Sequence, residues 1–143
     1  TTVVTAFIDD GTAYVANVGD SRAYAVRDDE IVQITTDHSV VSELVMRGTI
    51  TKEEARLHPQ KNIITRAVGT DKSVRTDIFE YNYSPGDVMI ICSDGLSTML
   101  DDSRILEIIK SKKTSEDTVN SLIAAAKDEG GLDNITVICI RFI

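Results

Sequence analysis

The sequence predicts an α+β fold, in which antiparallel strands surround a helical insert and are followed by two helices and a last strand. Three observations support this class. Four short β-branched and apolar runs with tight turns open the chain, as in an antiparallel meander. Residues 39–57 then change to helical spacing, and residues 101–129 hold two apolar stripes behind helix-capping residues. The 143 residues suit one domain.

The opening strands are predicted from runs of β-branched and apolar residues bounded by turn residues. The predicted strands are 2–8, 13–18, 23–26 and 31–34. Asp9-Asp10-Gly11 and Arg27-Asp28-Asp29 favour turns, and Gly19-Asp20-Ser21 interrupts the strands between them. Each strand is short, so we expect consecutive strands to pair as hairpins.

A helical flap is predicted at about 37–62. Apolar residues at positions 40, 41, 44 and 45 form a helical stripe, and Gly48 suits its C-terminal end. Thr51 and Glu54 form a capping box for a second short helix, which Pro59 stops. Because the apolar stripe is short, we expect this segment to cover the surface rather than join the core.

The second half is predicted to return to strands and to finish with two helices and a strand. Extended segments are expected at 63–68, 78–83 and 88–92, and the turn at 84–87 contains proline and glycine. The predicted helices follow Asp101-Asp102 and Thr114, and Gly130-Gly131 ends the second one. The last strand is expected at 135–142. This alternation gives the α+β layer pattern.

The composition excludes several classes of partner. Fifteen Lys and Arg against 23 Asp and Glu give a formal net charge of −8, which argues against nucleic acid and anionic membranes. The apolar run 88–92 is far shorter than the roughly 20 residues of a spanning helix, and no signal peptide opens the chain. Cys92 and Cys139 lie in apolar runs, so buried free thiols are favoured over a disulfide, and we expect a reducing, cytoplasmic setting.

Two aspartates are expected at one edge of a sheet. Asp94 follows the apolar strand 88–92 and precedes Gly95, which leaves room for a ligand beside the backbone. Asp133 precedes the last strand, so the two carboxylates meet if these strands are antiparallel neighbours. Close carboxylates repel unless a cation or proton intervenes, and oxygen ligands without His or Cys favour Mg²⁺ or Mn²⁺. The alternative role for Asp94 is capping of the helix that follows.

Other polar residues have two interpretations each. Asp20 also stands just past a strand, where an aspartate often bonds its own turn. His58 suits either catalysis or a surface loop, and the loop is favoured. Lys61 and Arg66 either guide an anion or are simply solvated. Asn134 either orients Asp133 through its amide or completes a turn.

Four motifs in order resemble the metal-dependent protein phosphatases, in their bacterial serine/threonine type-2C branch. They are Val15-Ala-Asn-Val-Gly-Asp-Ser-Arg22, His58-Pro-Gln-Lys-Asn62 with Ile64-Thr-Arg-Ala-Val-Gly69, Cys92-Ser-Asp-Gly-Leu-Ser97 and Gly131-Leu-Asp-Asn-Ile-Thr-Val137. One such motif has little specificity. Their order and the flap between them make the resemblance specific, and it covers essentially all 143 residues.

The resemblance implies a sandwich of two antiparallel β-sheets flanked by helices, and a hydrolase of phosphoserine and phosphothreonine. In that pattern Asp94 and Asp133 bind two Mg²⁺ or Mn²⁺ ions that activate a water, and Asp20 helps to hold a third ion. The further candidates for contact with the additional metal or the substrate are Asn62, Gly95 and Asn134. The flap, with His58, Lys61 and Arg66, shapes substrate access.

The same resemblance implies phosphorylated proteins as substrates and a cognate serine/threonine kinase as a partner. Members of the family also carry an N-terminal Asp-Gly-Met-Gly-Gly-His type motif, whose Asp bridges the metals, and an upstream phosphate-binding arginine. This chain has neither, and neither His38 nor His58 replaces them. We therefore expect the C-terminal portion of a catalytic domain, inactive alone but active in the full-length protein. The alternative is a non-catalytic binding or regulatory module.

Overall fold

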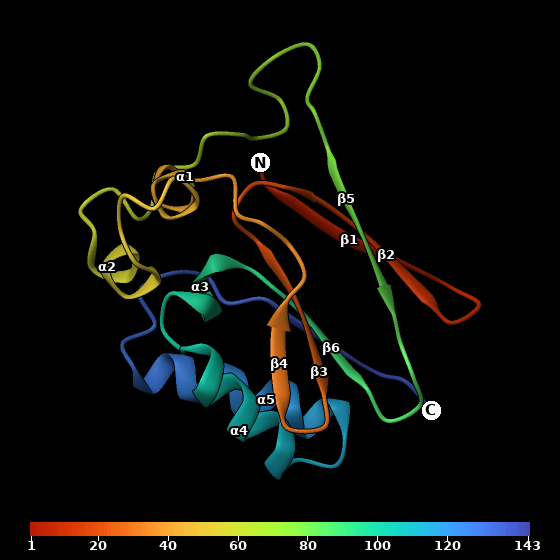
Figure 1. The fold of residues 1–143 in the computed structure, drawn as a ribbon. Helices are drawn as coiled ribbons and strands as arrows, with labels where there is room; N and C mark the ends of the chain where they lie inside the picture. The colour runs from red at the N-terminus through yellow and green to blue at the C-terminus, as the bar shows by residue number, and fades with distance from the viewer.

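The computed structural model describes residues 1–143 as two antiparallel sheets with helices along one side (Figure 1). The first sheet has the order β1-β2-β5, and the second has the order β4-β3-β6-β7. All neighbouring strands are antiparallel. The strand bounds are β1 Val3–Asp9, β2 Thr12–Val18, β3 Arg22–Arg27, β4 Glu30–Gln33, β5 Asp77–Asn82, β6 Val88–Cys92 and β7 Val137–Arg141. The predicted α+β class is confirmed.

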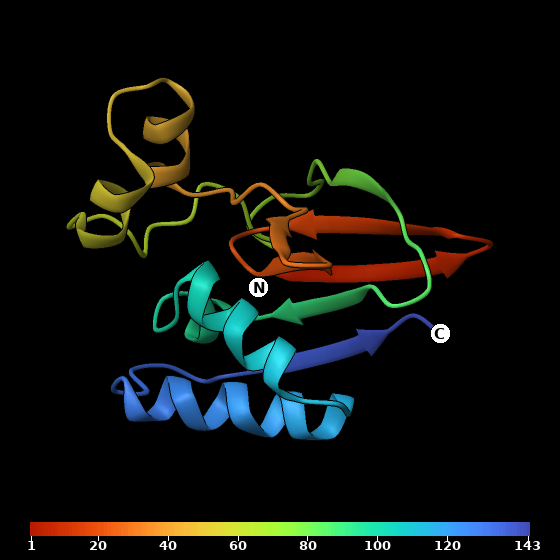
Figure 2. The ribbon, with the colours of Figure 1, turned by 60° about the horizontal axis from the view of Figure 1, so that its bottom comes forward.

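The molecule is built in three layers, seen edge-on in Figure 2: the three-stranded sheet, the four-stranded sheet, and a helical layer. Helices α4 (Asp102–Ser111) and α5 (Ser115–Asp128) form the helical layer. β6 lies in the middle layer and is buried along its whole length. Met89 and Ile91 pack into the core between the sheets, and Ile90 and Cys92 pack into the core under the helices. Burial on both faces explains why this strand is a continuous apolar run.

The predicted helix caps are confirmed. Asp101 accepts the Arg104 N–H at the start of α4, and Thr114 accepts the Asp117 N–H at the start of α5. The flap contains α1 (Val40–Met46) and α2 (Lys52–Leu57), and α2 begins with the expected capping box. One short helix, α3 (Asp94–Ser97), follows β6 directly.

The predicted meander of four consecutive strands is wrong, because the chain changes sheets after β2, so that β2 pairs with β5 and β3 pairs with β6. Two of the predicted strands also differ in the structure. Residues 63–68 do not form a strand, because their main-chain groups bond to several different segments, including Thr65 N–H to His38 and Val68 N–H to Thr1. Only an isolated bridge between Ser39 and Ile64 remains. The last strand begins at Val137 rather than at residue 135, because the preceding loop bonds to Ser93 instead of continuing the ladder.

Both cysteines are free, as predicted, with Cys92 buried and Cys139 half-buried. Burial raises the pKa of the Cys92 thiol to about 12, so it is an unreactive core group. No helix is long and apolar enough to cross a bilayer. The outer face of the three-stranded sheet exposes Phe7, Tyr14 and Ile78.

Asp87, in the turn before β6, joins the two sheets. Its buried carboxylate accepts hydrogen bonds from Arg27 Nη2 on β3 (2.6 Å), the Tyr81 hydroxyl on β5 (2.8 Å) and the Ser84 N–H (2.9 Å). The bond from Arg27 is the main reason why the pKa of Asp87 is lowered to about 2. The sequence predicts only a turn at this position.

We expect Asp87→Asn to lower the free energy of unfolding by about 2 kcal/mol near neutral pH, because Arg27 loses its anionic partner. Because the pKa of Asp87 is lower in the folded state, its charged form stabilises the fold at pH values above the ordinary pKa of 3.8. This stabilisation is lost as the pH falls through about 2. The difference between variant and wild type should therefore shrink in acid, as measured by urea unfolding. Asp71→Asn, at an exposed loop position, is the control. An equally stable Asp87→Asn protein would contradict this account.

Candidate metal centre

Three aspartates lie at one end of the four-stranded sheet, and the strand register brings them there. Arg22, Cys92 and Val137 occupy neighbouring positions on β3, β6 and β7. Asp20 lies two residues before Arg22, in the turn where the chain crosses from one sheet to the other, and Asp94 lies two residues after Cys92. The expectation that the strands next to Asp94 and Asp133 are antiparallel neighbours is confirmed.

Ser93 holds the Asp133 loop against the end of β6. Its N–H donates to the Thr136 carbonyl (3.1 Å), and its Oγ accepts the Thr136 N–H (3.0 Å) and donates to the Asn134 carbonyl (3.1 Å). The Asn134 N–H donates to Asp133 Oδ1 (2.6 Å). Asn134 thus orients Asp133 through its main-chain amide, and not through the side-chain amide that the sequence suggests.

Gly95 allows this loop to approach α3. A Cβ at residue 95 would lie 2.3 Å from the Asn134 carbonyl oxygen and 3.0 Å from its carbon. No real side chain fits at that distance from a main-chain group. The space beside Gly95 is therefore occupied by the Asn134 backbone, which corrects the expectation that it is room for a ligand.

The three carboxylates influence one another through Asp94. Burial raises the pKa of Asp94, and the charge of Asp133 raises it further. Burial also raises the pKa of Asp20, with the charge of Asp94 as the second cause. These shifts show that the charged forms of Asp94 and Asp20 are disfavoured in the absence of a cation.

The donor set fits hard divalent cations in its chemistry but supplies only part of a coordination shell. The donors are carboxylate oxygens without histidine or cysteine, which suits Mg²⁺ or Mn²⁺. No three His, Cys, Asp or Glu side chains gather closely enough to hold one ion together. The aspartates therefore offer two pairs that share Asp94, and each cation needs further oxygen ligands such as water.

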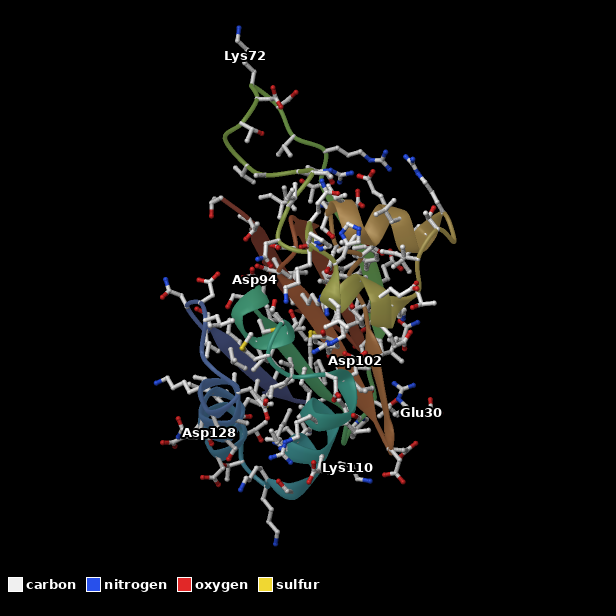
Figure 3. All side chains as sticks on the ribbon, turned by 90° about the vertical axis from the view of Figure 1, so that its left-hand side faces the viewer. Glu30, Lys72, Asp94, Asp102, Lys110 and Asp128 are labelled. Carbon is white, nitrogen blue, oxygen red and sulfur yellow. The ribbon has the colours of Figure 1, made fainter.

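An open cleft of about 590 Å³ lies between the flap and the segment α3–α4, with Asp20 and Asp94 in its lining. Figure 3 looks at the molecule from the flap side, where Asp94 and Asp102 lie beside the flap helices, while Lys72 and Asp128 lie far from them. Lys61 and Asn62 are exposed and line the flap side of the cleft. The sequence therefore identified two flap residues that the fold brings near the acidic site.

Two other flap candidates lie elsewhere. His58 is half-buried at the end of α2, where its Nδ1 accepts the Gln60 N–H (3.1 Å), and it does not line the cleft. The Arg66 guanidinium donates to Asp77 Oδ1 (2.9 Å) and to the Arg75 carbonyl (3.1 Å). Arg66 is therefore bonded within the root of the flap and does not line the cleft, and its role in guiding an anion stays a prediction.

Sequence reasoning missed Asp37 and its partner. Arg22 donates to both carboxylate oxygens of Asp37, through Nε (3.0 Å to each) and Nη2 (2.7 Å to Oδ2), and both residues line the cleft. Gln33 also donates to Asp37 (2.8 Å). Asp37 is thus paired with Arg22, and its charge is a lesser cause, after burial and Asp94, of the raised pKa of Asp20. No signal in the sequence links two residues separated by 15 positions.

Comparisons with known proteins identify the relatives of this chain. Residues 1–44 match the family model described as Protein phosphatase 2C. The serine/threonine phosphatase stp of Listeria innocua is 42% identical over 141 residues, which is 99% of this chain and 56% of the relative. Protein phosphatase PhpP of Streptococcus pneumoniae is 42% identical over 137 residues, or 96% of this chain and 56% of that protein. In sequence the chain is therefore similar to members of the protein phosphatase 2C family.

Solved structures confirm the 2C fold. The serine/threonine phosphatase Stp1 from Staphylococcus aureus superimposes with a TM-score of 0.96 at 42% identity, over 99% of this chain and 56% of that one. The catalytic domain of the phosphatase PstP, in complex with two manganese ions, has a TM-score of 0.86 at 35% identity. The match covers 96% of this chain and 56% of the PstP chain. The chain spans a little over half the length of the curated relatives it matches.

Proposed function

We propose that the full-length protein is a metal-dependent protein phosphatase that hydrolyses phosphoserine and phosphothreonine. The observation that carries the proposal is the pairing of Asp94 with Asp133 at the end of β6 and β7, in a 2C fold. The relatives that are 42% identical are themselves named serine/threonine phosphatases. Their names support the reaction class.

The chain's own residues have defined tasks in this proposal. Asp94 and Asp133 would hold two divalent cations, and Asp20 would help to hold a third, so that each cation relieves the repulsion between carboxylates. When bound, such cations supply an activated water and offset charge on the phosphoryl oxygens. Lys61 and Asn62 would contact the substrate segment that enters the open cleft.

The nature of the cation and of the partners follows from the same chemistry. Mg²⁺ and Mn²⁺ both suit carboxylate oxygens, and the related PstP catalytic domain has been solved with two manganese ions. The substrates would be phosphorylated proteins, which requires a serine/threonine kinase that produces them. The two free cysteines suit a reducing, cytoplasmic setting.

We expect the full-length protein to release phosphate from p-nitrophenyl phosphate and from a phosphothreonine peptide only with Mn²⁺ or Mg²⁺. EDTA should abolish the activity and added Mn²⁺ should restore it, because the aspartates alone provide no nucleophile. Phosphate release assays with each cation measure this directly. Activity that persists in EDTA would refute the proposal. The 143-residue chain alone should show no turnover.

A non-catalytic binding module is the second candidate, and one observation favours it: no three potential ligands gather around one point. Isothermal titration of the full-length protein with Mn²⁺ separates the two candidates. Stoichiometric binding of two or more ions, together with turnover, supports the phosphatase. Folded protein that binds a phosphopeptide and does not hydrolyse it supports the module.

A further inference from the structure

A cluster of buried polar side chains lies where the Asp20 turn meets the root of the flap. The cluster accounts for five of the eight buried polar or charged residues in the chain: Asn17, Ser21, Thr35, His38 and Ser39. Buried polar groups are costly unless they are hydrogen-bonded, so their bonds determine how the two segments lie. The geometry of the Asp20 turn therefore depends on hydrogen bonds as well as on apolar packing.

His38 makes the central contacts of this cluster. The residue is 6% exposed, its Nδ1 accepts the Gly19 N–H (2.9 Å), and its Nε2 lies 2.9 Å from Asp77 Oδ2. Because Nδ1 is an acceptor, the ring proton is on Nε2, which donates to Asp77. The His38 N–H also donates to the Gly19 carbonyl (2.9 Å). His38 thus bonds both main-chain polar groups of the residue before Asp20.

Gly19 has little freedom to move away from His38. Its φ is +115°, and a Cβ there would lie 2.3 Å from Thr2 Cγ2. Thr2 confines the glycine by contact, while His38 and the Asn17 amide, which donates to the Gly19 carbonyl (3.2 Å), confine it by hydrogen bonds. The direction in which the chain enters Asp20 is therefore set by these neighbours.

The other contacts of His38 reach both ends of the flap. Its carbonyl accepts the Thr65 N–H (2.8 Å), just after the flap, and its ring is bonded to Asp77 at the start of β5. Asp77 also accepts a bond from Arg66 (2.9 Å), and these two partners lower its pKa. His38 thus links the Asp20 turn and the three-stranded sheet through its ring, and the root of the flap through its carbonyl.

We propose that His38 is a positioning residue, which holds Asp20 in place relative to the flap through the bond from Gly19 N–H to Nδ1. The inference rests on the proposed function, because it assigns Asp20 to the metal centre. His38 touches neither substrate nor cation and acts only through Gly19. We therefore expect the affinity for metal, and not the affinity for substrate, to depend on the His38 side chain.

Two conservative substitutions in the full-length protein separate the two ends of the ring. Asparagine places an amide acceptor near the position of Nδ1, whereas glutamine reaches the position of Nε2 and leaves Gly19 N–H without its partner. His38→Gln should raise the Mn²⁺ concentration for half-maximal activity about tenfold, with little change in KM for p-nitrophenyl phosphate. His38→Asn should stay within about threefold of wild type, since the Gly19 bond is retained.

Two measurements that need no turnover complete the test. His38→Gln should accelerate hydrogen exchange of the Gly19 amide about tenfold, and His38→Asn should not. Mn²⁺-induced broadening of the Ser21 amide signal should require about tenfold more Mn²⁺ in His38→Gln. A wild-type protein without metal-dependent activity would refute the proposed function, and these two measurements would still decide the role of His38.

The inference would be overturned if the two variants had the same Mn²⁺ dependence and the same exchange rate of the Gly19 amide. It would also be overturned if the Gly19 amide exchanged faster in His38→Gln while the Mn²⁺ dependence stayed at the wild-type value. A loss of kcat alone in both variants would mark His38 as merely structural and would also overturn it. If His38→Gln does not fold, His38→Asn decides: wild-type Mn²⁺ dependence with a protected Gly19 amide supports the inference, and a tenfold loss of Mn²⁺ affinity overturns it.

Discussion

Asp94→Asn or Asp133→Asn is expected to lower the metal-dependent phosphatase activity of the full-length protein at least about 100-fold. Asparagine has nearly the same shape but removes the charge that draws a divalent cation to the shared carboxylate pair. Initial rates with p-nitrophenyl phosphate over a range of Mn²⁺ concentrations measure the effect. Asp71→Asn makes the same change of charge at an exposed loop position and should leave the rate unchanged.

The same Asp94→Asn substitution should have the opposite effect on stability without metal. The pKa of Asp94 is raised by burial and by Asp133, so its charged form disfavours the folded state at neutral pH. In EDTA the variant should melt about 1–3 °C above wild type, a small gain because the group is partly solvated. The gain should fade as the pH falls and Asp94 takes up its proton. A variant that is both inactive and less stable would point to misfolding rather than to a lost ligand.

Gly95→Ala should reduce the activity of the full-length protein about 10- to 100-fold, since a misplacement of about 1 Å in a catalytic site can cost that much. The new Cβ would stand 2.3 Å from the Asn134 carbonyl oxygen, so the loop that carries Asp133 must move away from Asp94. The rate at saturating Mn²⁺, and the Mn²⁺ concentration needed to reach it, measure the displacement.

Gly11→Ala is the matched control for this substitution. Gly11 lies between β1 and β2, and a Cβ there meets nothing within 4 Å, although its φ of +82° is unfavourable for alanine. The control should lose some stability and keep its activity. If Gly95→Ala keeps wild-type activity and Mn²⁺ dependence, the close contact with Asn134 does not position Asp133.

The predicted helices and most of the strands were confirmed because their signals are local. The caps at Thr51 and Asp101 each depend on a residue three positions away. The continuous apolar run of β6 follows from its burial on both faces. The prediction of a strand at 63–68 was wrong because strand pairing depends on distant main-chain partners, which no local signal specifies. Those residues have strand-like side chains, but their main-chain partners lie in separate parts of the fold.

The sequence by itself determined the α+β class, the main helices and the free cysteines, since turns and caps depend on short-range preferences. The pairing of β6 with β7 beside the two aspartates stayed conditional until the structure showed it. Only the tertiary structure decided how that site is supported. The Arg22–Asp37 pair spans 15 positions, the His38–Asp77 bond spans 39, and the bond between Ser93 and Asn134 spans 41. Such contacts form only when packing brings distant segments together, so no local sequence pattern predicts them.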